Sequence, residues 1–156
     1  MSHKTTVSDI TIDNVQAFME ACKTELGIQD VVDGRKTPAT VHIWDGKNIT
    51  NAVASATVNQ NGRKYSIGLV ENEKNPGQYN LVGDFSCFGW APTGKMREYA
   101  GVSKDASINA NEVQRIVKDM TLACSARAKL KKMAGYRSSK ITMNEARRVV
   151  LTADVA

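Results

Sequence analysis

The sequence predicts an α+β fold in which an antiparallel sheet carries two helices packed on one face. Two segments, 14–26 and 110–134, place apolar residues at helical spacing. Between them, short β-branched runs are separated by Asp-Gly and Asn-Gly pairs, which tolerate the positive φ of hairpin turns. Because such short connections join antiparallel neighbours, we expect the order β-α-β-β-β-β-α-β-β in a single domain, residues 1–156.

The N-terminal elements are predicted to be a strand and a capped helix. Residues 4–12 alternate and are rich in β-branched side chains, which is typical of a strand. Asp13 is a suitable N-cap, and Gly27 a suitable stop, for the apolar stripe between them. The helix 14–26 should therefore be amphipathic and cover one face of the sheet.

The central part of the chain is predicted to be β structure followed by a long loop. Residues 28–38 are turn-rich, and residues 86–108 form the longest irregular stretch. A loop of that length in a compact domain is often functional. The four expected strands between these segments cover 39–44, 49–58, 63–70 and 78–85.

The second helix is the most clearly marked element. Asn109 and Glu112 resemble a capping box, and Gly135 marks the end of a helix over 110–134. Its apolar stripe runs on into Arg127 and Lys131, whose charges must reach water. We therefore expect the last two turns to project past the sheet or to place their basic groups at its rim.

The tail is predicted to form two strands, 137–144 and 147–155, joined by a turn at Glu145-Ala146. Apolar positions facing inward in all these elements define an expected core. Its members are Val15, Phe18, Met19, Cys22, Leu26, Val41, Ile43, Ile67, Leu69, Leu81, Val113, Val117, Met120, Cys124, Ile141 and Leu151.

Charge is distributed unevenly along the chain. The net charge is +5, but residues 1–84 carry −2 and residues 85–156 carry +7. The basic excess is greatest in 127–148, where Glu145 is the one acid. This asymmetry indicates a polyanion or an acidic protein surface as partner. The alternative is a solvated helix end together with lysines that protect an edge strand.

Several classes of function find no support in the sequence. No apolar run approaches the length of a membrane span, and the N-terminus lacks a secretory signal pattern, so a cytoplasmic location is expected. The three cysteines form no CxxC pair or disulfide framework, and His3 and His42 have no neighbouring ligands at metal-site spacing. Nucleophile and P-loop motifs are also missing, so we expect no metal, no cofactor and no enzymatic activity.

Nucleic-acid binding is the favoured hypothesis, with RNA or single-stranded DNA as the ligand and low sequence specificity. Cations neutralise phosphates, and aromatic rings stack on unpaired bases. The expected stacking residues are Phe88, Trp90 and Tyr136, although packing roles are an alternative for Trp90 and Tyr136. The expected phosphate ligands are Arg127, Lys129, Lys131, Lys132, Arg137, Lys140, Arg147 and Arg148.

Several short motifs give the chain a resemblance to a known family. These are Met1-Ser2-His3, the block 65–69 (Tyr-Ser-Ile-Gly-Leu), the block 78–85 (Gln-Tyr-Asn-Leu-Val-Gly-Asp-Phe) and Gly135-Tyr136 after the long helix. Together they resemble an uncharacterised domain family that includes a conserved hypothetical reading frame of red-algal plastids and cyanobacteria, with bacterial and phage relatives. The resemblance implies a ferredoxin-like sheet with an added C-terminal strand, and it implies no activity.

The same resemblance supports a second hypothesis, a protein-binding adaptor. Some bacterial members of the family are thought to be encoded near AAA-type ATPases, so the implied partner is a larger assembly such as an ATPase or a phage complex. The loop around Trp90 would supply an apolar anchor, because tryptophan is enriched at binding hot spots. An exposed edge strand in the C-terminal hairpin would also allow a homo-oligomer.

Overall fold

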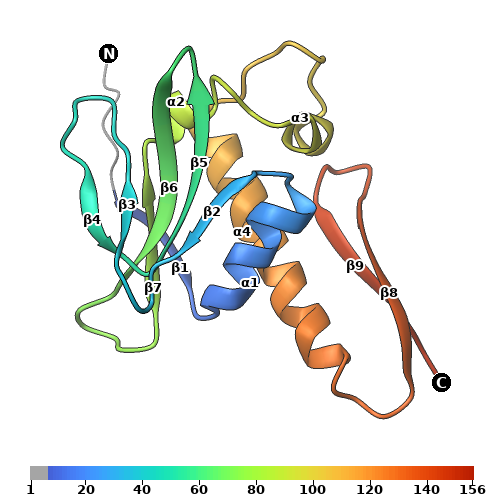
Figure 1. Ribbon diagram of the computed structural model, residues 1–156. Helices are drawn as coiled ribbons and strands as arrows, with labels where there is room; N and C mark the ends of the chain where they lie inside the picture. The colour runs from blue at the N-terminus through green and yellow to red at the C-terminus, as the bar shows by residue number, and fades with distance from the viewer. Residues whose placement is uncertain (1–6) are drawn as a thin grey trace.

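The computed structural model describes residues 7–156, which form a mixed α and β structure around a five-stranded antiparallel sheet (Figure 1). The sheet contains β1 (Val7–Ile12), β2 (Asp30–Asp33), β5 (Ala54–Gln60), β6 (Arg63–Glu71) and β7 (Tyr79–Gly83). Its strand order is β1-β7-β6-β5-β2. Two hairpins lie outside this sheet: β3 (Ala39–Val41) with β4 (Ile49–Ala52), and β8 (Tyr136–Met143) with β9 (Val149–Val155).

The sheet is covered on both faces. Helix α1 (Val15–Glu20), its π-helical continuation η1 (Ala21–Glu25) and helix α4 (Ala110–Leu130) lie on one face, and the β3–β4 hairpin lies on the other (Figure 1). Each side has its own apolar cluster. The larger one joins the helices to the sheet, and the smaller one contains Val41, Ile43 and Val82. Two short helices, α2 (Phe85–Phe88) and α3 (Gly94–Ala100), complete the described fold.

Asparagine side chains begin the two main helices. Asn14, rather than the predicted Asp13, caps α1 and accepts a hydrogen bond from the N–H of Ala17 at 2.9 Å. Asn109 caps α4 as predicted and accepts from the N–H of Glu112 at 2.9 Å. Each bond satisfies a donor that the first turn of a helix leaves unpaired.

Helix α4 ends one turn earlier than the sequence predicted. Its last residue is Leu130, and residues 131–135 turn the chain into β8. Gly135 has φ +84°, a value that glycine adopts without the steric cost that other residues meet. The basic residues after 130 therefore lie on a helix end, a turn and a strand.

Most of the expected core is buried, and the three exceptions have a common cause. Met19, Ile141 and Leu151 are half-buried because they lie at the margins of the main sheet. Met19 lies beside the sheet edge, while Ile141 and Leu151 belong to the β8–β9 hairpin. That hairpin contacts α4, and it pairs with no strand of the main sheet in the described part of the chain.

The ferredoxin-like arrangement is not confirmed. In such a fold the strand after the second helix joins the sheet, whereas β8 and β9 pair with each other alone among the described strands. Strand β2 and helices α2 and α3 were not predicted, since their segments are rich in turn residues. The Met1-Ser2-His3 motif and residues 4–6 of the first expected strand lie outside the described residues. Within 7–156, no helix is both long and apolar enough to cross a membrane.

Candidate nucleic-acid interface

Arg127 joins α4 to the first helix and is not available as a phosphate ligand. Its guanidinium donates to the carboxylate of Glu20, donates to Glu25 at 3.1 Å, and lies 3.8 Å from the sulfur of Cys124. Its side chain is 14% exposed. Burial alone would lower the pKa of Arg127, but the hydrogen bonds that its guanidinium donates to the two carboxylates raise it. Two acids therefore already neutralise Arg127, which was predicted as a phosphate ligand.

The same contacts define a group of potential metal ligands that the sequence analysis missed. Single ligand atoms of Glu20, Glu25 and Cys124 lie within 4.8 Å of one another. The Arg127 guanidinium already supplies the positive charge there, and burial raises the pKa of the Cys124 thiol to about 12. A thiolate is the form of cysteine that binds metal, and the raised pKa keeps Cys124 as the thiol. The group therefore serves to hold the Arg127 guanidinium. No motif marks it, because Cys124 is about a hundred residues from the two acids in sequence.

Two further arginines fasten the turn of the β8–β9 hairpin to the body. Arg148 donates to both carboxylate oxygens of the buried Asp119, at 2.8 and 3.1 Å. Arg147 has φ +59° and donates to the carbonyl oxygen of Ala100 at 2.9 Å, and its own carbonyl accepts from Arg115. These contacts place Arg147 and Arg148 in structural roles, although both remain exposed.

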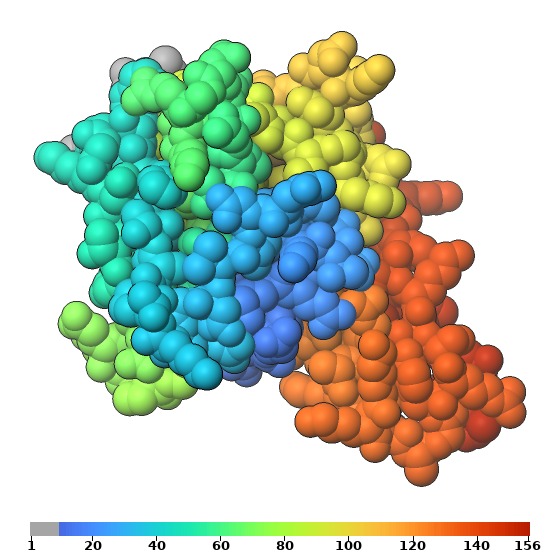
Figure 2. All heavy atoms as spheres, in the orientation of Figure 1, coloured from blue at the N-terminus to red at the C-terminus, as the bar shows by residue number. Residues whose placement is uncertain are grey.

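The other five predicted cations lie together at one end of the molecule. We call residues 129–140 the basic lobe. It comprises the last turn of α4, the connecting turn and the start of β8. These segments belong to the protrusion at the lower right of Figure 2. Lys129, Lys131, Lys132, Arg137 and Lys140 are all exposed. Among the described residues, no acid lies within ion-pair distance of any of them.

Of the three predicted stacking residues, one belongs to the basic lobe. Tyr136 is half-buried, and its hydroxyl shares a hydrogen bond of 2.7 Å with Ser139. Phe88, also predicted to stack on a base, is 0% exposed and packs in the main core, so its ring is not at the surface. Trp90 follows Gly89, which packs against Val113 in the first turn of α4. Since α4 has 21 residues, Trp90 and the basic lobe lie near opposite ends of a helix about 30 Å long.

Trp90 instead belongs to an aromatic patch that the sequence did not predict. Its ring meets those of Trp44 and Tyr65 edge-on, with centroids 6.2 and 6.1 Å away. The guanidinium of Arg63 lies 4.1 Å from the centre of the Trp44 ring. Trp44 and Trp90 are each 37% exposed. We call Trp44, Arg63, Tyr65 and Trp90 the tryptophan patch.

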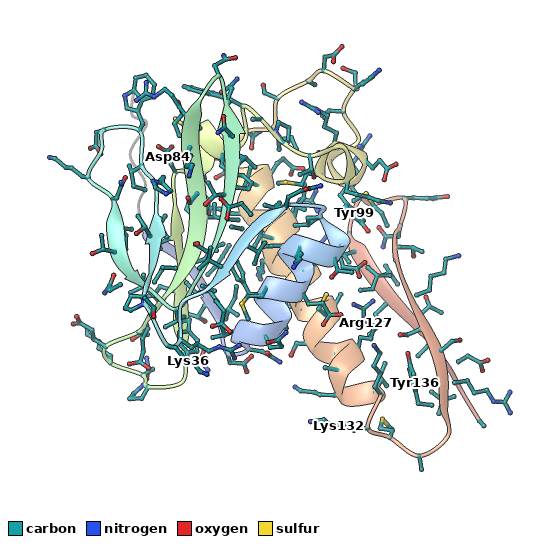
Figure 3. The ribbon with its side chains drawn as sticks, viewed as in Figure 1. Lys36, Asp84, Tyr99, Arg127, Lys132 and Tyr136 are labelled. Carbon is teal, nitrogen blue, oxygen red and sulfur yellow. The ribbon has the colours of Figure 1, made fainter. Side chains whose placement is uncertain are left out.

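Asp84 holds the tryptophan patch in place. It is fully buried, and its two carboxylate oxygens accept from the backbone N–H groups of Trp44 at 2.7 Å and Cys87 at 3.2 Å. Figure 3 shows Asp84 far from Lys132 and Tyr136. The basic lobe and the tryptophan patch are therefore separate surface features of the described residues, whereas the sequence pattern predicted one combined site.

Burial makes the cysteines unreactive. It raises the pKa of Cys87 to about 12, with the hydrogen-bonded Asp84 adding to the effect, and it raises the pKa of Cys22 further. All three cysteines are buried, and none forms a disulfide. A thiol is nucleophilic as its thiolate, so these groups serve as core side chains, as the helical spacing of Cys22 and Cys124 suggested.

No family model matches this chain, and neither the curated proteins nor the solved structures searched contain a match.

Proposed function

We propose that the chain is a non-enzymatic, cytoplasmic protein that binds RNA or single-stranded DNA through the basic lobe, with low sequence specificity. The observation that supports this most directly is the set of five exposed cations that, among the described residues, have no acid within ion-pair distance. Exposed, uncompensated lysines and arginines neutralise phosphates and release their counterions, which favours binding whatever the base sequence.

The position of the aromatic residues bears on the mode of binding. Tyr136 is the aromatic side chain within the basic lobe, and it is half-buried. One partly exposed ring offers at most a single stacking contact, worth about 1–3 kcal/mol. We therefore propose that most of the affinity comes from the phosphate backbone, and that the bases contribute little.

A titration against salt tests this proposal. Fluorescence anisotropy of a labelled 20-nucleotide single-stranded RNA should show binding at low salt. Each phosphate engaged on a single strand contributes a slope of about −0.7, so five cations set a limit of about −3.5 for log K against log salt. Poly-uridine and a mixed sequence should bind alike. Absence of binding at 20 mM salt, or a slope near zero, would overturn the proposal.

An adaptor is the second candidate, favoured by the tryptophan patch. Two tryptophans, each 37% exposed and braced by Tyr65 and Arg63, form an anchor of the kind found at protein interfaces. The partner would be a larger assembly such as the AAA-type ATPase or phage complex that the family resemblance implies. Affinity capture from nuclease-treated lysate separates the candidates. A protein retained by the wild type and lost by Trp90→Ala supports the adaptor, and loss of all partners with nuclease supports the nucleic-acid binder.

A further inference from the structure

Among the strands of residues 7–156, β2 forms one edge of the main sheet and pairs with β5 alone. The backbone N–H of Gly34, directly after β2, donates to the carbonyl of Val53 at 2.9 Å. Backbone groups of successive residues alternate in direction along a strand. Val32 therefore also directs its N–H and C=O toward β5, while Val31 and Asp33 direct theirs outward from the sheet. This edge is a template on which a further strand can form.

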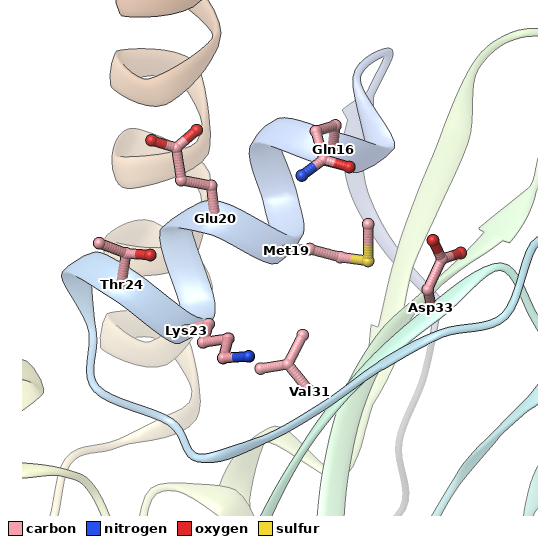
Figure 4. Close-up of a pocket in the computed structure, with 7 residues that line it drawn as sticks. All are labelled: Gln16, Met19, Glu20, Lys23, Thr24, Val31 and Asp33. Carbon is pink, nitrogen blue, oxygen red and sulfur yellow. The ribbon is translucent and has the colours of Figure 1, made fainter.

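A pocket of about 360 Å³ lies directly beside this edge (Figure 4). It is lined by residues of β2 and of the α1–η1 helix, and it opens to solvent. Met19 and Val31 give it an apolar wall, and Gln16 and Thr24 add polar groups at its margin. A side chain on a strand added beside β2 can therefore enter a space that is already formed.

The charges around the pocket favour an acidic occupant. Of the two acids that line it, Glu20 is bound by Arg127, and Asp33 is bound by Arg35 at 2.6 Å. Lys23 also lines the pocket, and within residues 7–156 no carboxylate lies within ion-pair distance of it. Figure 4 shows the Lys23 ammonium directed toward Val31, whereas the Glu20 carboxylate is directed toward α4. The charge left for an incoming group is thus positive.

We propose that the β2 edge and this pocket bind an extended segment of a partner protein that bears a glutamate side chain. The segment adds as a sixth strand through the outward backbone groups of Val31 and Asp33, in the manner of β-augmentation. The methylenes of its glutamate lie on Met19 and Val31, and its carboxylate pairs with Lys23. This site is separate from the basic lobe and does not depend on the nucleic-acid proposal.

Asp30 does not oppose an acidic occupant of this pocket. Residues alternate between the two faces of a strand, so Asp30 lies on the opposite face of β2 from Val31, Asp33 and the pocket.

Labelled peptides test the proposal on the full chain. The probe is a hexapeptide of alternating valine and threonine with one central glutamate, and its controls are the glutamine peptide and a backbone N-methylated version. Fluorescence anisotropy should give saturable binding for the glutamate peptide and about tenfold weaker binding for the glutamine peptide. N-methylation should abolish binding, since it removes the donors that pair with β2. Amide hydrogen exchange at Val31 and Asp33 should slow when the peptide is bound.

Variants of the protein complete the test. Lys23→Gln should weaken the affinity for the glutamate peptide by about tenfold and leave the affinity for the glutamine peptide unchanged, because the substitution removes the ion pair alone. Lys23 is exposed, so the fold should not depend on it. Lys118→Gln, an exposed lysine on α4, should change neither affinity. Equal binding of the two peptides, indifference to N-methylation, or no binding at 1 mM peptide would each overturn the proposal.

Discussion

At the scale of single residues, Arg127 illustrates how a charged side chain becomes part of the core. Its guanidinium lies between Glu20 and Glu25, and its side chain is 14% exposed. Arg127→Gln leaves both carboxylates without their cation, and breaking such a partly buried network should cost about 2 kcal/mol in the free energy of unfolding. Urea denaturation measures the loss. The matched variant Lys129→Gln, two residues along α4 and exposed, should change stability by less than about 0.5 kcal/mol. Equal stability of both variants would contradict the structural role of Arg127.

Glu112 gives the chain a dependence on pH at the start of α4. Hydrogen bonds from Arg115, at 2.8 and 3.0 Å, hold the pKa of Glu112 below its ordinary value of 4.5. A carboxyl group with a lowered pKa in the folded state stabilises the fold above its ordinary pKa, and this contribution is lost as the pH falls through the folded value. Glu112→Gln should therefore lower the free energy of unfolding at pH 7 by up to about 1 kcal/mol, and the difference should shrink below pH 4.5.

Denaturation at pH 7 and pH 3 checks this prediction. The exposed pair of Glu98 with Lys95 on α3 supplies a control. Glu98→Gln should change stability by less than about 0.5 kcal/mol at either pH. A deficit for Glu112→Gln that stays constant down to pH 3 would show that the carboxylate charge is not the cause.

At the scale of elements, the β3–β4 hairpin packs so closely on the sheet that one position of β6 accommodates glycine alone. A Cβ on Gly68 would lie 2.6 Å from the carbonyl oxygen of Ala54 and 2.7 Å from a methyl of Val41. Gly68→Ala should therefore cost about 2 kcal/mol through overpacking. Gly94→Ala is the matched control, because its Cβ meets nothing within 4 Å, and it should raise stability by up to about 1 kcal/mol. Thermal unfolding distinguishes the two, and an unaltered melting temperature for Gly68→Ala would contradict the close approach.

The sequence predicted the elements whose apolar stripes, caps and turn residues lie within a short segment of the chain. The apolar stripe of α4 and its cap at Asn109 are local features, and both are confirmed. So are the turns at Asn61-Gly62 and Glu145-Ala146. Strand β2 was missed because its four residues, two of them acidic, form a strand through pairing with β5, and a pattern of local propensity does not contain that pairing.

The candidate site was predicted in part for the same reason. Exposed cations after Leu130 follow from the charge count and from the end of the apolar stripe, and five of the eight lie in the basic lobe. The partners of the other three are distant in sequence: Glu20 and Glu25 for Arg127, Ala100 for Arg147, and Asp119 for Arg148. The burial of Phe88 could not be predicted, because helix α2, which places it in the core, has four residues and is too short to show a helical pattern in the sequence.

At the scale of the whole molecule, the charge asymmetry of the sequence becomes an arrangement in space. Three acids of the first half are paired with arginine: Glu20 and Glu25 with the partly buried Arg127, and Asp33 with the exposed Arg35. The arginines of the hairpin turn fasten the hairpin to α3 and α4. The basic lobe gathers five exposed cations at one end of α4, with no acid within ion-pair distance among the described residues, and the tryptophan patch lies near the other end of this helix. This separation predicts that changes in one feature leave the binding properties of the other intact.

The salt dependence of single-stranded RNA binding by two charge-matched variants tests the central claim most directly. One variant combines Lys131→Gln, Lys132→Gln and Arg137→Gln in the basic lobe. The other combines Lys36→Gln, Lys74→Gln and Lys104→Gln, which are exposed elsewhere. The lobe variant should lose about 2 from the magnitude of the log–log slope, at about 0.7 for each phosphate contact, and the control should keep the wild-type slope. Equal losses in both variants would show that net charge alone governs binding and would contradict a localised site.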